Sequence, residues 1–345
     1  MDIKTYFSEK LDKLLFLNLS GEDVYLPLKS SHIIADVKAG QSLENIPFSY
    51  FIYGIFFVLG ADESFKFKEN YIKIINKTEG SIKFIKGKIA EEIKNQNYED
   101  GYILLKGLSL IEKSEDVFEK LILILHFLKE KHDFFKEEEL NVLNNAKNIE
   151  GYYKPYYYEA VIKNENKHYS EALSSLDKFI ELSGESSKEL LEFRASMLKL
   201  SNYETGKAMI YEEPKAALAL LLPFLEEATE DAALYYYIGV CYRVLDNFQK
   251  SIYYLNEALN IDPDLVQVVN ELGINFASLG NYDTAIAYLR KAFEATKSVE
   301  ICTNLILCYI NSGKLEEAKS HLAIAEKLDP RDELVLEFKN ILKDC

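Results

Sequence analysis

The chain has 345 residues, with 40 Lys and Arg against 56 Asp and Glu, so its formal net charge is −16. This length exceeds the roughly 250–300 residues that one compact core accommodates, and it predicts two domains or a repeat array. The apolar content of 48%, with only 15 Gly and 7 Pro, is typical of a folded protein. The negative excess argues against a nucleic-acid partner, because it repels phosphates.

Secretion and membrane insertion are not expected. The amino terminus mixes acidic with apolar residues, unlike the apolar core of a secretory signal. The longest apolar run, 46–61, has 16 residues and is interrupted by Pro, Ser and Gly. It is shorter than the roughly 18–20 residues that span a bilayer, and it predicts a buried helix instead. Four cysteines without CxxC spacing favour a reducing compartment and a cytoplasmic protein.

The amino-terminal part of the chain is predicted to be mainly helical. Residues 23–37 can form a strand, although a short helix that begins at Ser30 or Ser31 and ends at Gly40 fits at least as well. Gly54 is expected where two paired helices approach closely. Three degenerate helix pairs are expected here: 49–60 with 64–77, 81–95 with 97–113, and 115–131 with 135–147.

A repeat becomes visible further along the chain. Its mark is a small residue placed three positions after an aromatic or aliphatic residue that ends a polar turn. The small residues are Gly101, Ala172, Ser251, Ala285 and Ala318, separated by 71, 79, 34 and 33 residues. The first two separations are close to twice the last two, so each fits two units. The polar stretch 201–213 is able to hold the extra residues of the longest separation.

This spacing and internal pattern resemble the tetratricopeptide repeat family. In the family consensus, helix A carries large apolar or aromatic residues at positions 4, 7 and 11 and a small residue at position 8. Helix B carries small residues at positions 20 and 27, and Pro follows at position 32. Units counted from Ala232, Val266 and Val299 follow this pattern, with three departures. The second unit lacks the Pro, and the third has Cys302 at position 4 and Ile306 at position 8.

The resemblance implies an all-α fold, a right-handed α-solenoid of about eight antiparallel helix pairs with a C-terminal capping helix. Each pair leaves an apolar face that only a neighbouring pair can cover. The rings Tyr242, Phe276 and Tyr309, at position 11, are expected to fill the wedge between one pair and the next. The expected segments are a divergent helical region at 1–80, degenerate helix-pair repeats at 81–152, a repeat array at 153–330 that is clearest over 232–330, and a capping helix at 331–345.

The resemblance also implies a binding groove, lined by helix A positions 2, 5, 9 and 12, which share one face of the helix. The candidate groove residues for a peptide or protein partner are Tyr157, Val161, Tyr236, Val240, Arg243, Asn270, Ile274, Thr303 and Asn304. This mixture of aromatic, amide and apolar groups suits an extended or helical peptide. The alternative, that neighbouring A helices pack some of these side chains, stays open.

One known subtype of the family can be tested on the sequence. Members that bind chaperones hold a terminal carboxylate in a clamp of Lys, Arg and Asn side chains. The matching positions here are Tyr236, Val240, Glu271, Glu300 and Asn304. Because the two glutamates would repel a carboxylate, we do not expect a carboxylate-clamp chaperone adaptor.

Catalytic and metal-binding motifs are missing from the sequence, which has no GxGxxG, GxxxxGK[ST], GxSxG or HExxH. The run 137–139 of three glutamates could supply paired carboxylates, but solvated helix faces are the more ordinary interpretation. Cys302 occupies a packing position and is expected to be a buried small hydrophobe. We therefore expect no cofactor, no metal and no enzymatic activity.

Tyrosine is abundant, with 24 Tyr and no Trp, and it clusters at 152–158, 235–237 and 253–254. These clusters fit either an adhesive binding surface or a bias in composition. The sequence therefore predicts a protein–protein interaction scaffold or adaptor that binds a peptide or partner protein in the groove. A peptide-responsive regulatory sensor, with the N-terminal third as effector module, and an enzyme are the alternatives.

Overall fold

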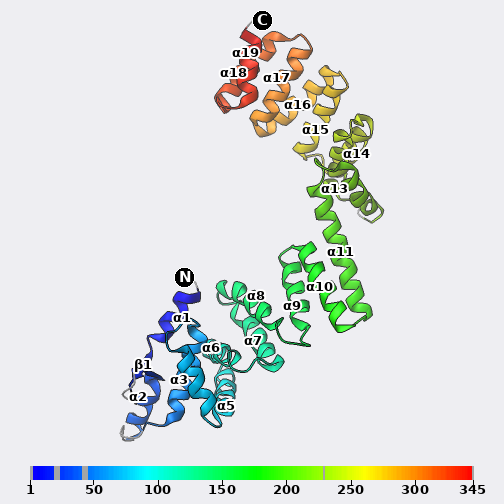
Figure 1. Cartoon of the computed structure of the whole chain (residues 1–345). Coiled ribbons are helices and arrows are strands. Elements are labelled where there is room, and N and C mark those ends of the chain that lie inside the picture. The colour runs from blue at the N-terminus through cyan, green and yellow to red at the C-terminus, as the bar shows by residue number, and fades with distance from the viewer. Residues whose placement is uncertain (1–2, 19–23, 41–45, 228–229, 344–345) are drawn as a thin grey trace. The chain divides into compact units, whose positions relative to one another are not determined.

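The computed structural model describes residues 3–18, 24–40, 46–227 and 230–343. These residues form helices joined by short connections, with one small β-hairpin near the amino terminus (Figure 1). Residues 1–194 and 195–345 form two compact units, and their boundary falls within a single helix. The all-α prediction is confirmed, with the hairpin as a minor addition, while the handedness of the solenoid and the role of the last helix as a cap stay predictions.

The first unit contains the hairpin and ten helices among its described residues. Their bounds are α1 (Ile3–Leu11), β1 (Leu14–Leu17), β2 (Leu26–Lys29), α2 (Ser30–Lys38), α3 (Phe48–Ala61), α4 (Lys68–Lys77), α5 (Ser81–Lys94), α6 (Tyr98–Ser109), α7 (Glu115–Leu128), α8 (Phe134–Ala146), α9 (Lys154–Glu165) and α10 (Tyr169–Ser183). The two strands pair antiparallel. Both interpretations of 23–37 are partly right, because a strand that ends at Lys29 leads directly into a helix that begins at Ser30. Asp23 lies outside the described residues.

Gly54 accommodates the hairpin and not a paired helix. A Cβ atom on Gly54 would lie 2.0 Å from the carbonyl oxygen of Pro27, so β2 rests directly on the backbone of α3. Leu28, the next residue of the strand, is fully buried. The prediction of a close approach at Gly54 was therefore right about the crowding and wrong about the partner.

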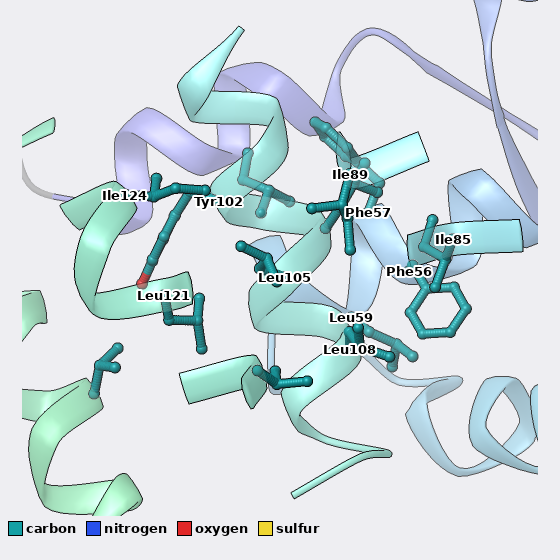
Figure 2. Packing of buried hydrophobic residues seen from close by; sticks show 14 of the residues in the cluster. Phe56, Phe57, Leu59, Ile85, Ile89, Tyr102, Leu105, Leu108, Leu121 and Ile124 are labelled. Atoms are coloured by element: carbon teal, nitrogen blue, oxygen red, sulfur yellow. The ribbon is translucent and has the colours of Figure 1, made fainter. Parts of the chain in front are cut away.

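Helix α3 is the centre of the core of the first unit. Every residue from Phe51 to Gly60 is buried, as expected for a helix that is apolar on all sides. Figure 2 shows side chains of α3, among them Phe56, meeting side chains of α5, α6 and α7 in one cluster. Helix α3 packs mainly along α6 and only lightly along α4, so the expected pairing of 49–60 with 64–77 was wrong.

The next helix pairs are present as expected. The segments 81–95 and 97–113 form α5 and α6, which pack together, and 115–131 and 135–147 form α7 and α8 in the same way. A further pair, α9 with α10, follows directly. The degenerate part of the chain therefore consists of helix pairs although its sequence matches the repeat pattern poorly.

The second unit contains three regular helix pairs, with further helices before and after them (Figure 1). The elements are α11 (Lys188–Ala208), which crosses the boundary between the units, α12 (Pro214–Leu221), a 3₁₀ helix (Leu222–Glu226), α13 (Ala232–Val244), α14 (Phe248–Ile261), α15 (Val266–Ser278), α16 (Tyr282–Thr296), α17 (Val299–Asn311), α18 (Leu315–Leu328) and α19 (Glu333–Lys343). The polar stretch 201–213 absorbs its extra residues largely by lengthening α11 to 21 residues.

Glycines let helix A meet helix B closely in two of the three regular pairs. A Cβ atom on Gly239 would lie 2.8 Å from Cγ of Leu255, and one on Gly273 would lie 2.5 Å from Cγ of Leu289. These contacts join position 8 of helix A to position 24 of helix B in successive units. Each leucine is fully buried, so the glycine creates the space that the leucine fills.

Aromatic side chains also form a contact that recurs in each of the three regular units. The pairs, with the distances between ring centroids, are Tyr242 with Tyr254 (5.4 Å), Phe276 with Tyr288 (5.6 Å) and Tyr309 with His321 (4.9 Å). Each pair joins position 11 of helix A to position 23 of helix B within the same unit. The rings at position 11 therefore pack on their own helix B, which the expected wedge between pairs did not foresee. This packing role accounts for part of the high tyrosine content.

Helix α19 packs on the last regular pair through Val335, Phe338 and Leu342, which are all buried in the same cluster as α17 and α18. On its other faces, Leu334 and Leu336 are 45% and 47% exposed. No helix among the described residues is both long enough and apolar enough to span a membrane.

Candidate functional site

Two of the predicted groove residues lie in the first unit. Tyr157 and Val161 are partly buried on α9. The ring of Tyr157 lies 5.4 Å from the ring of Phe179 and 6.4 Å from that of Phe193, measured between centroids. Tyr157 therefore packs against α10 and the start of α11, and a binding role for it stays a prediction.

The other predicted groove residues lie on α13, α15 and α17, the A helices of the second unit. Two of them do not line a surface. Val240 and Thr303 are each 1% exposed. Val240 packs in the cluster that contains Ile238, and Thr303 donates a 2.7 Å hydrogen bond from Oγ1 to the carbonyl oxygen of Glu300. Both side chains are therefore buried instead of lining a groove, and we correct the prediction for these two residues.

We use the name A face for the side of the second unit formed by these A helices together with the end of α11 and the turn after it. Tyr236, Asn270, Ile274 and Asn304 are partly exposed members of the predicted set. The full A face comprises Tyr203, Lys207, Tyr211, Tyr236, Tyr237, Arg243, Asn270, Glu271, Ile274, Glu300, Asn304 and Leu307.

A buried ion pair between successive repeats lies on the A face. Arg243 of α13 donates a hydrogen bond through Nε to the carboxylate of Glu271 on α15. The side chain of Glu271 is 7% exposed and that of Arg243 is 21% exposed. Burial raises the pKa of Glu271 above its usual range, Arg243 opposes this shift, and the negative charge of Glu300 adds to it. Glu300 is exposed and has no ion-pair partner within the described part of the chain.

Tyrosine rings border the ion pair. The centroids of the Tyr236 and Tyr237 rings are 5.4 Å apart, and Tyr211 is 64% exposed. Burial raises the pKa of Tyr236 far above its ordinary value, and the negative charges of Glu271 and of ionised Tyr211 raise it further.

A second group of rings surrounds a lysine at the end of α11. The Nζ atom of Lys207 lies 5.5 Å from the ring centroids of both Tyr203 and Tyr237. The hydroxyl group of Tyr203 donates a 3.1 Å hydrogen bond to Asp231, whose carboxylate also caps α13 by accepting from the backbone N–H of Leu234. The prediction from sequence missed these residues. Tyr203 and Lys207 are four residues apart on α11, which was the signal for a shared helix face. Tyr211 lies in the turn after α11, where no such spacing applies.

An apolar side chain on the A face also remains uncovered. Leu307 of α17 is 45% exposed, although its neighbours Ile306 and Cys308 are buried. Leu307 occupies position 9 of its unit, as Ile274 does in the unit before it. The A face thus combines exposed apolar and aromatic groups with a partly exposed row of polar ones.

The residues considered for chemistry have packing roles. Cys302 is fully buried, as expected, and burial raises the pKa of its thiol to about 11. Glu138 and Glu139 are not solvated, contrary to the expectation, because Glu138 pairs with Lys106 at 2.5 Å and Glu139 with Lys129 at 2.9 Å. Among the described residues no group of three or more His, Cys, Asp or Glu is arranged to hold a metal ion.

The chain is similar to several known proteins over part of its length. It is 31% identical over 118 residues to BBSome complex member BBS4 of Bos taurus, which is 34% of this chain and 22% of that protein. The chain therefore spans about a fifth of that relative.

Solved structures with a likeness to this chain include YrrB, described as a TPR protein with an unusual peptide-binding site, and the APC/C hetero-tetramer Cut9–Hcn1. YrrB is 21% identical, with 54% of this chain and 91% of YrrB covered and a TM-score of 0.41. The Cut9–Hcn1 chain is 13% identical, with 85% of this chain and 62% of that chain covered and a TM-score of 0.42. Likenesses at this level carry no inference about function.

The repeat units themselves are matched directly. Residues 232–265 match one family model and residues 276–341 match another, and both models are described as Tetratricopeptide repeat. The matched residues include the glycine–leucine crossing of α13 with α14 and the position-11 rings Phe276 and Tyr309. Residues 232–265 and 276–341 of this chain are therefore tetratricopeptide repeats.

Proposed function

We propose that the chain is a protein-interaction scaffold that holds a peptide segment of a partner protein on the A face of residues 195–345. Tetratricopeptide repeats support the scaffold role in general. The observation that carries the specific site is Leu307, an apolar side chain that is 45% exposed in the middle of a helix whose adjacent residues are buried. An apolar group in this setting gains free energy when a partner covers it.

The proposal keeps two exclusions from the sequence. Glu271 and Glu300 stand on the A face where a carboxylate clamp would need cations or amides. Glu271 is already paired with Arg243, and the unpaired Glu300 would repel a partner that ends in a free carboxylate. The net charge of −16 likewise disfavours nucleic acid. A cytoplasmic location is part of the proposal, because three of the four cysteines are free and buried thiols.

The test compares two leucines with the same exposure. Leu307→Ser removes the apolar group on the A face, and Leu334→Ser removes one from α19, and each leucine is 45% exposed. Because neither side chain is buried, both variants should melt within a few degrees of wild type. Proteins captured from an extract of the native cell by immobilised full-length chain are then quantified for wild type and both variants.

We expect Leu307→Ser to lose a partner that Leu334→Ser retains. Equal capture by all three proteins would show that Leu307 contacts no partner and would reject the A face as the site. A melting temperature that falls sharply for Leu307→Ser alone would show that this leucine is part of the core, which also contradicts the proposal.

A further inference from the structure

The A face already binds cations that belong to the chain itself. Lys207 lies over the rings of Tyr203 and Tyr237, with Nζ 5.5 Å from each ring centroid. An ammonium group over the face of a tyrosine is attracted by the negative potential of the π system. Arg243, about a repeat further on, pairs with Glu271. Two different cations are therefore held by tyrosine rings or carboxylates on one side of this unit.

The negative groups of the A face are not fully neutralised by these two cations. Glu271 is neutralised by Arg243, but Glu300 on the next A helix is exposed and has no salt-bridge partner among the described residues. The whole segment 195–345 contains 23 Asp and Glu against 14 Lys and Arg. A ligand that approaches this face therefore meets a negative potential and an uncompensated carboxylate.

Aromatic surface also remains available. Tyr211 is 64% exposed, and Lys207 covers other rings than this one. Tyr236 is next to Tyr237 and only partly exposed, so it offers part of its surface. Open tyrosine rings and unpaired carboxylates are each groups that arginine and lysine side chains bind.

We propose that the A face recognises a basic segment of its partner, with one cationic side chain against Tyr211 and Tyr236 and another opposite Glu300. This inference rests on the proposed function and names the chemistry of the ligand. Arginine is the better fit of the two cations, because its planar guanidinium group can stack on a ring and pair with a carboxylate at the same time. An acidic segment carries the opposite charge and would be repelled by the same negative potential.

Binding is measured by fluorescence anisotropy with the full-length chain and four labelled peptides of twelve residues. The peptides are identical except at three positions, which carry Arg, Lys, citrulline or Glu. Citrulline keeps the shape and the planar group of arginine without its charge. We expect the Arg and Lys peptides to bind, the citrulline peptide to bind at least about tenfold more weakly, and the Glu peptide to show no binding, with affinity falling as salt is added.

Matched variants separate a defined site from general attraction to an acidic protein. Tyr211→Ala and Glu300→Gln should each weaken binding of the Arg peptide by about two- to fivefold, the effect of one exposed cation–π contact or ion pair. Tyr253 of α14 is 59% exposed, and Glu316 of α18 has a side chain that is 87% exposed. Tyr253→Ala and Glu316→Gln, on B helices, should therefore leave binding unchanged.

The outcomes distinguish this inference from the proposed function. Equal binding of the Arg and citrulline peptides would reject a cation site while leaving a peptide-binding scaffold in place. Equal losses in the A-face and B-helix variants would show non-specific electrostatic attraction and would also reject the site. If no peptide binds although Leu307→Ser still loses its captured partner, the scaffold stands and the basic ligand is wrong.

Discussion

The crossing of α3 and α6 gives the sharpest test of the fold. A Cβ atom on Gly60 would lie 1.8 Å from the carbonyl oxygen of Ile103 and 2.8 Å from the backbone nitrogen of Gly107. Favourable contacts between non-bonded heavy atoms are near 3.5–4.0 Å, so Gly60→Ala must push the two helices apart by more than about 1 Å. Overpacking by one methyl group typically costs about 1–3 kcal/mol. Because the obstacle here is backbone, we expect a loss of about 3 kcal/mol or more in the free energy of unfolding.

Gly87 provides the matched control for this substitution. It also lies inside a helix, α5, but it is exposed and a Cβ atom there would meet nothing within 4 Å. Gly87→Ala should therefore stabilise the protein by about 0.5–1 kcal/mol, through the higher helix propensity of alanine. Urea unfolding followed by circular dichroism should show the Gly60→Ala midpoint lowered by about 1 M or more and the Gly87→Ala midpoint unchanged or raised. Midpoints that move together for both variants would refute the close backbone contact.

Three further predictions concern the second unit. Arg243→Ala leaves Glu271 buried without a counter-charge, so it should lower the free energy of unfolding at pH 7 by about 3 kcal/mol. This loss should shrink toward pH 5 in urea titrations, because a carboxyl group with a raised pKa binds its proton more tightly in the folded state and gains stability as the pH falls. Asn281 caps α16 with its side chain, whereas Lys314 at the same repeat position gives α18 no side-chain cap. Lys314→Asn should therefore raise the free energy of unfolding by about 0.5–1 kcal/mol and the melting temperature slightly. An unchanged melting temperature would contradict this. Burial raises the pKa of the Cys241, Cys302 and Cys308 thiols to about 11. In a Cys345→Ser variant, these three thiols should therefore react with a disulfide reagent at least about 100-fold more slowly in the folded protein than in guanidinium chloride. Rapid labelling of the folded protein would show that they are accessible.

The regular repeats could be predicted because the residues that define their sequence pattern are the ones that pack helix A against helix B. In two of the three regular pairs, a glycine at position 8 leaves room for a leucine at position 24, as Gly239 does for Leu255 and Gly273 for Leu289. The spacing of about 34 residues follows from the length of two helices and two turns. Both the helices over 232–330 and the way they pair could therefore be predicted from the sequence.

The first unit was predictable in its helices but not in its packing. Gly54 was correctly identified as a site of crowding, yet no sequence pattern indicated that a strand through Pro27 would cause it. The crossing of Gly60 with Gly107 joins residues far apart in the sequence, and glycines without a periodic partner do not reveal which helix they face. Long-range pairing of this kind depends on tertiary contacts that local patterns do not encode.

The candidate site shows how far a repeat position can predict exposure. Position 9 of helix A is Val240, Ile274 and Leu307 in successive units. Val240 is 1% exposed, Ile274 is partly exposed and Leu307 is 45% exposed. Position 9 is therefore buried in α13, partly exposed in α15 and exposed in α17, because the side chains of the adjoining helices decide whether it is covered. A groove defined only by repeat positions mixes residues that hold the solenoid together with residues that a partner can reach. Substitution of the buried members would lower stability and binding together. Only exposed residues of the A face, Leu307 and Tyr211 above all, can separate recognition from folding.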